Sequence, residues 1–448
     1  MTGDKTYDRT DDTIRSKAAA SASSSECANE PRAQKGEPSK EPLLFLYANL
    51  SAARRRVCYG LLVLLGFSLG CSEFVVIGIE PELAEAFDCS LARVGDLISW
   101  FALSYAIATP LLAIFTSQFR RSSLLAVYLF VFVVGNLVSM VAESFELLLA
   151  SRVLMGAVAG PLLAVGTTYV PDLLGPKHSS MGISVVYAAF SIALVLATSA
   201  GRFIAEYLTW HIAMEGAFAF ALITAILLRF IMPKSAHGSD GVASPANQLR
   251  LLKEPAVIFG VLIFLFGIGA VYTFYGYVAP YLETTLGLSA AQSGGVLLVF
   301  GCICFVSDIL SGVIDLRFGM KALPPIFVAL AAALFGLWLA GANAALAIAA
   351  TFVIALLMYS FSIPCITMFM DVARRKHPGA LILAASVEPT SFNIGISFGT
   401  AAGGLVVTNL GLQAVGLVGG IFALLACACS VAAIVSWRKI RAERALAR

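Results

Sequence analysis

The sequence predicts an all-α membrane protein whose twelve transmembrane helices form two pseudo-symmetric six-helix bundles. Composition, the length of the apolar segments and an internal repeat lead to this prediction. Hydrophobic residues make up 59% of the 448-residue chain and charged residues only 13%, too little polar surface for a water-soluble protein. The apolar segments are continuous and reach about 20 residues or more, the length at which an α-helix crosses a bilayer.

The internal repeat has a constant offset of 199 residues. It relates Pro81 to Pro280, Leu83 to Leu282, Ser90 to Ser289, Gly95 to Gly294, Phe119 to Phe318, Asp172 to Asp371, Lys177 to Lys376 and His178 to His377. No insertion or deletion separates these pairs, so the two halves are copies of one unit. Two like-oriented helical bundles are typical of secondary transporters, which hold their solute at the interface between the copies.

The predicted elements follow in order along the chain. Residues 1–50 are polar and without apolar periodicity, which predicts a disordered cytoplasmic tail. The first bundle, 51–232, has spans near 57–80, 94–116, 123–142, 146–170, 180–206 and 211–232. A polar cytoplasmic linker at 233–254 leads to the second bundle, 255–437, with spans near 255–282, 291–314, 323–341, 344–370, 380–408 and 412–437. Residues 438–448 are a basic cytoplasmic tail.

The charged residues predict the orientation of the chain. Basic residues gather at one set of predicted helix ends, among them Arg54–Arg56, Arg120, Arg121, Lys253, Arg374–Lys376, Arg438 and Lys439. The opposite loops carry mainly acids, namely Glu82, Glu85, Asp88, Glu143, Glu146 and Glu283, together with Arg93. The positive-inside rule therefore places both termini in the cytoplasm and the chain in the cell (inner) membrane. The net charge of +3 reflects this topology and does not indicate nucleic-acid binding.

Several classes of protein are excluded by missing motifs. The sequence has no Gly-x-x-x-x-Gly-Lys-Ser/Thr loop for ATP and no Gly-x-Ser-x-Gly elbow, so we expect neither a primary pump nor an enzyme. Cysteine pairs at 302/304 and 427/429 point to different sides of a helix, which disfavours a metal site. We expect no cofactor and no metal.

Glu73 and Arg152 are predicted to lie inside the membrane. A charged residue there costs about 2.5–3.5 kcal/mol, so it is usually functional or paired. Glu73 lies about 24 Å from the cytoplasmic end of its span, and Arg152 lies about 9 Å from the outer end of its own, at similar depth. We interpret Glu73 as the proton carrier and Arg152 as the group that tunes its acidity. A static ion pair that only fixes helix packing remains open.

Other polar residues have weaker interpretations. Glu388, beside Pro389, is a second titratable site or solute contact, or a helix distortion that admits water. Tyr272 and Tyr275 are predicted to line a solute cavity, with a place in the aromatic belt at the membrane interface as the alternative. The less specific expectations are an interfacial carboxylate at Glu80, an i,i+4 pair between Arg202 and Glu206, and a place in the membrane-interface belt for Tyr281.

Four segments together resemble a known family. They are SEFVVIGIEPELAEAF (72–87), SRVLMGAVAG (151–160), YTFYGYVAPYLETTLGLS (272–289) and FNIGISFGTAAGG (392–404). About residues 55–437 resemble the major facilitator superfamily, with the closest likeness to its arabinose-efflux-permease-like branch of proton-driven sugar and drug exporters. The resemblance implies a cavity lined mainly by helices 1, 4, 7 and 10, and alternating access by rocking of the bundles. It also matches Glu73 to the helix-1 acid, Arg152 and Gly156 to the helix-4 motif, and Tyr359 to a cavity position.

The family's cytoplasmic signature, Gly-x-x-x-Asp-Arg-x-Gly, has one near copy here. Gly312, Asp315, Arg317 and Gly319 form it in the second half, and we call these four residues the predicted latch. The corresponding first-half positions are Ala113, Thr116, Gln118 and Arg120, so the first-half latch is expected to be weaker. Asp308, seven residues before Asp315, is assigned to the same region.

The sequence therefore predicts a secondary active transporter that exports a small organic solute, a sugar or drug-like molecule, by proton-coupled alternating access. Uptake or facilitated diffusion on the same fold remains open, as does a transport-dead receptor or scaffold. The expected partners are the solute, protons and the lipid bilayer, without nucleic acid, and the chain is expected to be monomeric.

Overall fold

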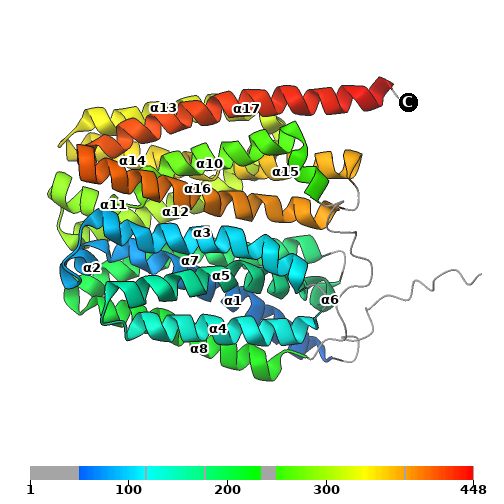
Figure 1. Ribbon diagram of the computed structural model, residues 1–448, viewed down its shortest axis with the longest axis horizontal. Coiled ribbons are helices and arrows are strands. Elements are labelled where there is room, and N and C mark those ends of the chain that lie inside the picture. Colours follow the sequence, from blue (N-terminus) through cyan, green and yellow to red (C-terminus); the bar gives the residue numbers. More distant parts are fainter. Residues whose placement is uncertain (1–49, 117–118, 176–177, 234–248, 378–379, 447–448) are drawn as a thin grey trace, which may run out of the picture. The chain divides into compact units, whose positions relative to one another are not determined.

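A computed structural model describes residues 50–116, 119–175, 178–233, 249–377 and 380–446, all within one compact unit (Figure 1). The predicted tail at 1–50, apart from Leu50, and most of the predicted linker at 233–254 lie outside these residues. The described part contains twelve helices long and apolar enough to cross a membrane. The twelve predicted spans are confirmed.

The first half of the chain supplies six long helices and two short ones. They are α1 (Ala52–Gly78), α2 (Glu80–Ala86), α3 (Leu91–Phe115), α4 (Arg121–Met140), α5 (Phe145–Thr167), α6 (Val170–Leu174), α7 (Ser179–Tyr207) and α8 (Trp210–Ile231). Within this half α1 packs on α7 and α8, and α5 packs on α3 and α4.

The second half repeats the plan. Its elements are η2 (Arg250–Lys253), α10 (Pro255–Tyr275), α11 (Val278–Pro280), η3 (Tyr281–Thr285), α12 (Ala290–Arg317), η4 (Gly319–Ala322), α13 (Leu323–Ala340), α14 (Ala344–Met358), α15 (Ser362–Lys376), α16 (Leu381–Leu410), η6 (Leu412–Ala414) and α17 (Val415–Leu446). Here α10 packs on α16 and α17, and α13 packs on α14 and α17. The last helix continues past the predicted end of its span at 437.

The repeat is visible in how equivalent helices begin. Ser90 caps α3 by accepting a hydrogen bond from the Arg93 amide, and Ser289 caps α12 by accepting one from the Gln292 amide. A serine hydroxyl at this position satisfies an amide that has no partner within the helix. The same local chemistry therefore starts the same helix in each half.

Several of the predicted spans are interrupted. Within the predicted span 255–282, the helix α10 ends at Tyr275 and the short helix α11 follows. In the same way, α1 ends at Gly78 and α2 follows. Each break precedes a proline of the repeat, Pro81 or Pro280, whose ring has no amide hydrogen to continue the helix. The predicted span 344–370 is divided between α14 and α15.

The two halves meet along two helix pairs, α3 with α16 and α7 with α12. In Figure 1, α3 and α16 lie side by side between the halves. The α7–α12 contact is close enough to require glycine, because a Cβ built on Gly301 would lie 2.7 Å from Cα of Val195. On the α3–α16 side the Ser99 hydroxyl donates to the Ser397 carbonyl at 3.1 Å.

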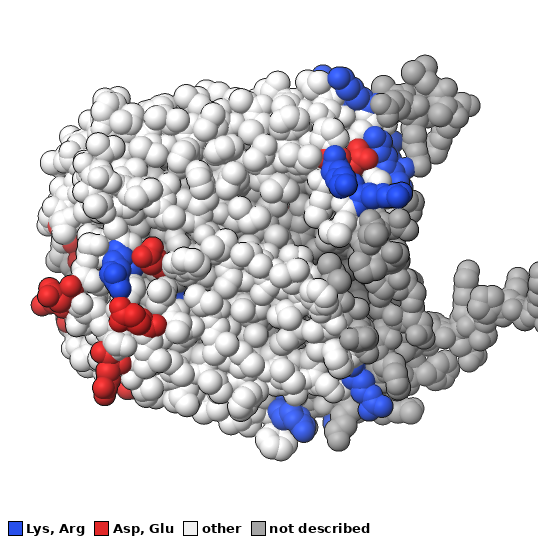
Figure 2. All heavy atoms as spheres, in the orientation of Figure 1, with Lys and Arg blue, Asp and Glu red and all other residues white. Residues whose placement is uncertain are grey.

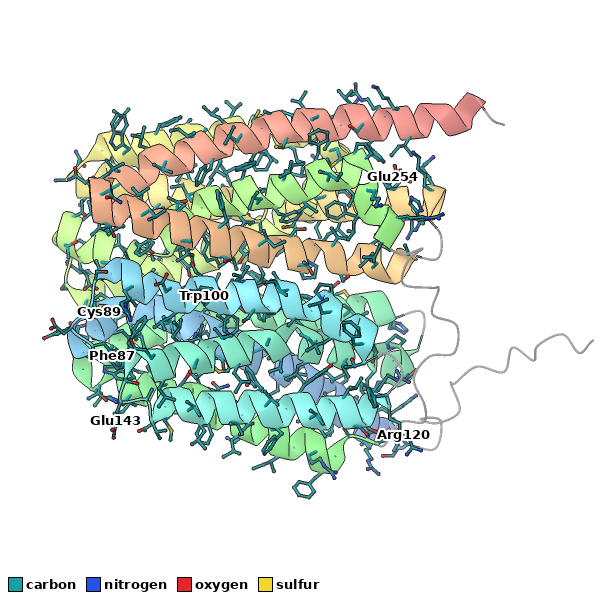
Figure 3. The ribbon with its side chains drawn as sticks, in the orientation of Figure 1. Phe87, Cys89, Trp100, Arg120, Glu143 and Glu254 are labelled. Carbon is teal, nitrogen blue, oxygen red and sulfur yellow. The ribbon has the colours of Figure 1, made fainter. Side chains whose placement is uncertain are left out.

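Charged residues mark two ends of the bundle (Figure 2). We call the end that carries α2 and η3 the acidic end, and the opposite end, with Arg54–Arg56 and Arg374–Lys376, the basic end. Figure 3 places Glu143 and Cys89 at the acidic end and Arg120 and Glu254 at the basic end. This separation agrees with the predicted charge pattern.

Buried apolar residues connect the halves mainly toward the acidic end. One cluster of the described residues joins the stretch from Cys71 to Ile79 of α1 to the core of the second half. A second cluster holds the stretch from Cys58 to Leu69, nearer the basic end of α1, and all its members belong to the first half. The halves are thus packed together most continuously near the acidic end.

Candidate functional site

Glu73 is a buried carboxyl group on α1. Its side chain is 5% exposed, and its Oε2 atom has no hydrogen-bond partner among the described residues. Leaving a buried acceptor without a partner is costly, and a buried carboxylate without a partner is costlier still. The site is therefore suited to hold a proton or to meet a ligand.

Arg152 lies beside Glu73 but does not bond to its carboxylate. From α5, its guanidinium donates to the main-chain carbonyls of Ser72 and Glu73, the latter at 2.8 Å, and to the Leu97 carbonyl on α3 at 3.4 Å. The guanidinium also stacks over the Phe101 ring, 4.4 Å from its centroid. Arg152 therefore binds three helices together while its charge acts on Glu73 through space.

Ser72 extends this arrangement to a fourth helix. Its hydroxyl donates to Asn136 Oδ1 on α4 at 2.8 Å, and the Asn136 amide nitrogen donates to the Phe132 carbonyl at 2.9 Å. The backbone that carries Glu73 is consequently held from two sides. Sequence reasoning did not identify Ser72 or Asn136, because uncharged polar residues in a span give a weak signal.

A tyrosine from α3 lies within electrostatic range of an acid from each half. Tyr105 is 4% exposed and interacts electrostatically with both Glu73 and Glu388. Tyr187 on α7 interacts with Glu388 as well. Because Glu388 belongs to α16, this group spans both halves, and sequence reasoning did not identify either tyrosine.

The predicted tyrosines of α10 are fully buried. Tyr272 packs edge to face with Tyr275, with ring centroids 5.4 Å apart, and Tyr275 stacks on Phe300 at 4.7 Å. Tyr272 interacts electrostatically with Glu73, and its hydroxyl has no hydrogen-bond partner among the described residues. Tyr272 thus offers a second unsatisfied polar atom close to Glu73.

Tyr359 is placed by the break between α14 and α15. Pro364 prevents a continuous helix there, and serines of α12 bond the freed amides: Ser307 accepts from Tyr359 N and Ser311 from Ile363 N, both at 3.0 Å. The Tyr359 ring then stacks on Phe392 with centroids 5.5 Å apart.

Exposure of the candidate residues decreases from the basic end inward. Tyr187 is 38% exposed and Glu388 is half-buried, whereas Tyr359 is 9% and Glu73 5% exposed. Beyond Glu73, toward the acidic end, Glu80 is 0% exposed. The arrangement is therefore more open toward the basic end than toward the acidic end.

An ion-pair cluster joins the halves at the acidic end. Arg202 of α7 pairs with Glu82 of α2 and with Glu283 of η3, and its Nε lies 2.6 Å from Glu283 Oε1. The predicted pair with Glu206 is wrong, since Glu206 is exposed and α2 and η3 bring two carboxylates to the guanidinium. We call Arg202, Glu82 and Glu283 the acidic-end cluster.

Two further expectations for the acidic end are wrong. Glu80 is buried rather than interfacial, because α2 folds back against α3 and α11. Tyr281 is 1% exposed and packs edge to face with Phe274, at a centroid distance of 5.4 Å, instead of facing the membrane interface.

Among the described residues, no side-chain hydrogen bond or ion pair joins the predicted latch residues to one another. Asp315 accepts a hydrogen bond from the Thr367 hydroxyl at 2.8 Å, Arg317 is exposed, and a Cβ on Gly312 would meet nothing within 4 Å. Gly319 has a φ of +55°, which favours glycine for the turn rather than for a close approach.

The remaining latch-region residues make other contacts. Asp308, expected near the latch, instead accepts from the Ser191 hydroxyl of α7 at 3.0 Å, across the interface between the halves. In the first half Arg121 pairs with Asp172 at 3.1 Å. Its repeat partner Asp371 pairs with Arg375 at 2.7 Å, so both copies of this acid are held by an arginine. Gln118 lies outside the described residues.

At the basic end, Glu254 joins the start of α10 to the end of α15. Its carboxylate lies 3.1 Å from Lys376 Nζ and 3.0 Å from His377 Nε2. Partial burial by itself would raise the pKa of Glu254, but the hydrogen bonds from His377 and Lys376 outweigh it and lower the pKa below its usual value.

Two surface pockets lie away from the candidate site. One, of about 480 Å³, is at the acidic end between Phe87, Glu143 and Trp210, and the other, of about 240 Å³, is at the basic end between Arg120 and Arg229. Neither pocket includes Glu73, Arg152 or Tyr272. These three residues are themselves buried.

Two similar six-span halves that enclose buried acids at their interface define a membrane transporter of the secondary class. The family model for the Major Facilitator Superfamily matches residues 62–387. Because this match covers most of the sequence, the chain belongs to the Major Facilitator Superfamily.

Known relatives agree with this assignment. The chain is 24% identical to the uncharacterized MFS-type transporter YtbD of Bacillus subtilis, over 84% of this chain and 94% of that protein. It is 26% identical to the inner membrane transport protein YdhP of Escherichia coli K12, over 83% and 95% of the two chains.

Solved structures agree in fold. A bacterial homolog of the human lysosomal transporter Spinster, in an inward-facing and unoccupied conformation, superposes with a TM-score of 0.70 at 16% identity, covering 87% of this chain and 99% of that one. The D-xylose-proton symporter gives a TM-score of 0.66 at 17% identity, over 85% and 97% of the chains. At such identities the likeness shows the fold alone.

Proposed function

We propose that the protein exports a small organic solute, a sugar or drug-like molecule, across the inner membrane in exchange for protons. The observation that carries this proposal is the Glu73 carboxyl, which is buried between the halves with one oxygen unsatisfied. In this proposal Glu73 binds the proton, and the halves rock to expose it to each side in turn. Solute and proton compete for the same region, which couples their movements.

Arg152 is the positioning residue in this mechanism. Its guanidinium holds the α1 backbone at Ser72 and Glu73 and leaves the carboxyl oxygen available for a proton. Its positive charge favours release of that proton once water or solute reaches the site. The exchange needs both the protonated and the ionised state of Glu73. A permanently charged or permanently neutral group could not couple the movement of solute to the movement of protons.

The solute is proposed to bind next to Glu73, among Tyr272, Tyr275, Tyr359 and Glu388. Aromatic faces and hydroxyls suit sugars and amphipathic molecules, and the unsatisfied Tyr272 hydroxyl offers a donor. The basic end is proposed to face the cytoplasm by the positive-inside rule. The gradient of exposure from Tyr187 to Glu73 is consistent with solute entry from that side.

Purified protein in liposomes with an imposed pH gradient tests this proposal. L-arabinose and ethidium serve as probes for the two solute classes, and internal pyranine records proton movement. We expect probe-dependent proton flux in the wild type and a loss of about tenfold or more in Glu73→Gln, with solute counterflow retained. Glu85→Gln, at an exposed carboxyl of the acidic end, is the matched control and should transport normally.

Other outcomes would decide against the proposal. Coupled flux in Glu73→Gln equal to the wild type would remove Glu73 from the mechanism. Counterflow without proton flux in the wild type would establish facilitated diffusion on the same fold.

A further inference from the structure

Glu80 is a second buried acid whose role the proposed mechanism leaves unexplained. It begins α2, directly after the break that ends α1, and its side chain is 0% exposed. Both of its carboxyl oxygens have no hydrogen-bond partner among the described residues. A carboxylate in such surroundings loses its hydration with no compensating bond, which strongly favours the neutral, protonated form.

The surroundings of Glu80 come from both halves of the protein. Its own helix α2 packs against α3 of the first half and α11 of the second. Tyr275 and Tyr277 of the second half, each 1% exposed, interact electrostatically with the Glu80 carboxyl. Closing the acidic end therefore requires the second half to cover Glu80.

The charged groups nearby do not neutralise Glu80. The charged and titratable side chains near the acidic end of the surrounding elements are Glu73 on α1, Glu82 and Glu85 on α2, Arg93 and Asp96 on α3, Arg202 on α7, Glu283 on η3, and Tyr275 and Tyr277. Both cations of this group bond to other acids: Arg93 pairs with Glu146, and Arg202 bonds to Glu82 and Glu283. The acidic-end cluster thus takes up the positive charge that would otherwise stabilise an ionised Glu80.

We propose that Glu80 is a second proton-binding site, distinct from Glu73, and that it must be protonated for the two halves to close at the acidic end. When the halves separate there, water reaches the carboxyl and the O–H bond breaks, with the proton leaving to water. Before the halves close again, water must return a proton to the carboxylate. The proposal rests on the alternating access of the proposed function but not on the role of Glu73.

Burial supports the direction of this effect. Because it removes solvation from the charged form, it raises the pKa of Glu80 well above the usual value for glutamate in the closed arrangement. Higher pH therefore favours the open arrangement, in which Glu80 is hydrated and ionised. With one proton linked to closure, the closed-to-open ratio changes by at most about tenfold per pH unit.

The test measures opening of the acidic end directly, with protons as the only ligand. Spin labels are attached at Glu85→Cys in the first half and Ala342→Cys in the second, both at exposed positions. Double electron–electron resonance between these labels measures the distance between the halves. The protein carries no native cysteines in this experiment and is held in nanodiscs between about pH 5 and pH 9. We expect one short distance at low pH and a growing longer population as the pH rises.

Variants assign this response to Glu80. Glu80→Gln and Glu80→Leu, which are neutral at every pH, should keep the short distance throughout, whereas Glu80→Asp should retain a pH response. Glu82→Gln and Glu283→Gln test the acidic-end cluster and should still respond to pH. Glu73→Gln should respond as the wild type does, which separates this proposal from the failure of the proposed function.

Three results would overturn the proposal. They are a wild-type distance that does not change with pH, a Glu80→Gln response equal to that of the wild type, and a response that follows sodium concentration at constant pH. If Glu80→Gln does not fold, the same comparison is made with Glu80→Leu.

Discussion

Arg152 donates a hydrogen bond to the main-chain carbonyl of Glu73 at 2.8 Å, rather than to the Glu73 carboxylate. This geometry separates two functions that a direct ion pair would combine. The arginine holds the α1 backbone in place, and one carboxyl oxygen of Glu73 has no hydrogen-bond partner among the described residues. Arg152 fixes helix packing, as the alternative interpretation of the sequence expected, but it does so through main-chain carbonyls and not through a direct bond to the Glu73 carboxylate.

Replacing Arg152 by lysine should destabilise the protein. Lysine lacks the planar fork that reaches carbonyls on α1 and α3 together, and loss of a hydrogen bond from a charged donor costs about 1.5–3 kcal/mol. We expect a lower thermal unfolding midpoint in detergent for Arg152→Lys. Arg93→Lys is the control, because the Arg93–Glu146 pair is exposed and contributes little. Equal midpoints for both variants would contradict the structural role of Arg152.

Ser307→Ala should loosen the break between α14 and α15. The variant leaves the Tyr359 amide without its acceptor, at a cost of about 1–3 kcal/mol, and frees the Tyr359 ring that is proposed to contact solute. Thermal midpoint and apparent solute affinity should both fall. Ser430→Ala is the matched control, since among the described residues that buried hydroxyl bonds only to the Cys427 carbonyl of its own helix. An unchanged solute affinity in Ser307→Ala would show that Tyr359 does not contribute to solute binding.

Gly301→Ala should force α7 and α12 apart. The new methyl group would overlap the Val195 backbone, and overpacking of this kind costs about 1–3 kcal/mol. Gly312→Ala adds the same methyl group where nothing lies within 4 Å, so it should be neutral or stabilise α12. Comparing the two thermal midpoints also tests the predicted latch. A marked loss in Gly312→Ala would indicate a contact there in another conformation.

Glu254→Gln should make the protein less dependent on pH in the acidic range. The pKa of Glu254 is lowered in the folded chain, so its ion pairs stabilise the fold above the unfolded value of 4.5. This contribution disappears as the pH falls through the lowered pKa. The difference in thermal midpoint between wild type and Glu254→Gln should therefore be constant near neutral pH and shrink below about pH 4.5. A difference that grows on acidification would have the wrong sign for this cluster.

Much of the fold followed from local patterns. Twelve apolar runs, the 199-residue repeat and the charge asymmetry depend on residue type and spacing alone, and each has a counterpart in the structure. The breaks at Gly276 and near Tyr359 were not predicted, because hydropathy hardly changes there and the prolines lie several residues away. The burial of Glu73 and Arg152 was expected from their depth in apolar spans.

Pairing between side chains was harder to predict. The i,i+4 spacing of Arg202 and Glu206 suggested a local pair, yet Arg202 bonds to carboxylates 120 and 81 residues away in the sequence. Glu80 was expected at the membrane interface because it ends a predicted span and lies beside Glu82. The burial of Glu80 depends on the contact between α2 and α11 across the two halves. The residues near Glu80 in the sequence do not indicate that contact.

Hydrophobicity and helix-stopping residues act within a few turns of chain, and so the sequence was sufficient for the class of protein, the number of spans and the duplicated plan. Which atom of Glu73 meets Arg152, which acids Arg202 selects and whether Glu80 sees water depend on contacts between segments distant in the chain. Those contacts exist only after the helices have packed, and their energies depend on distances of a few ångströms, which spacing along the sequence does not specify.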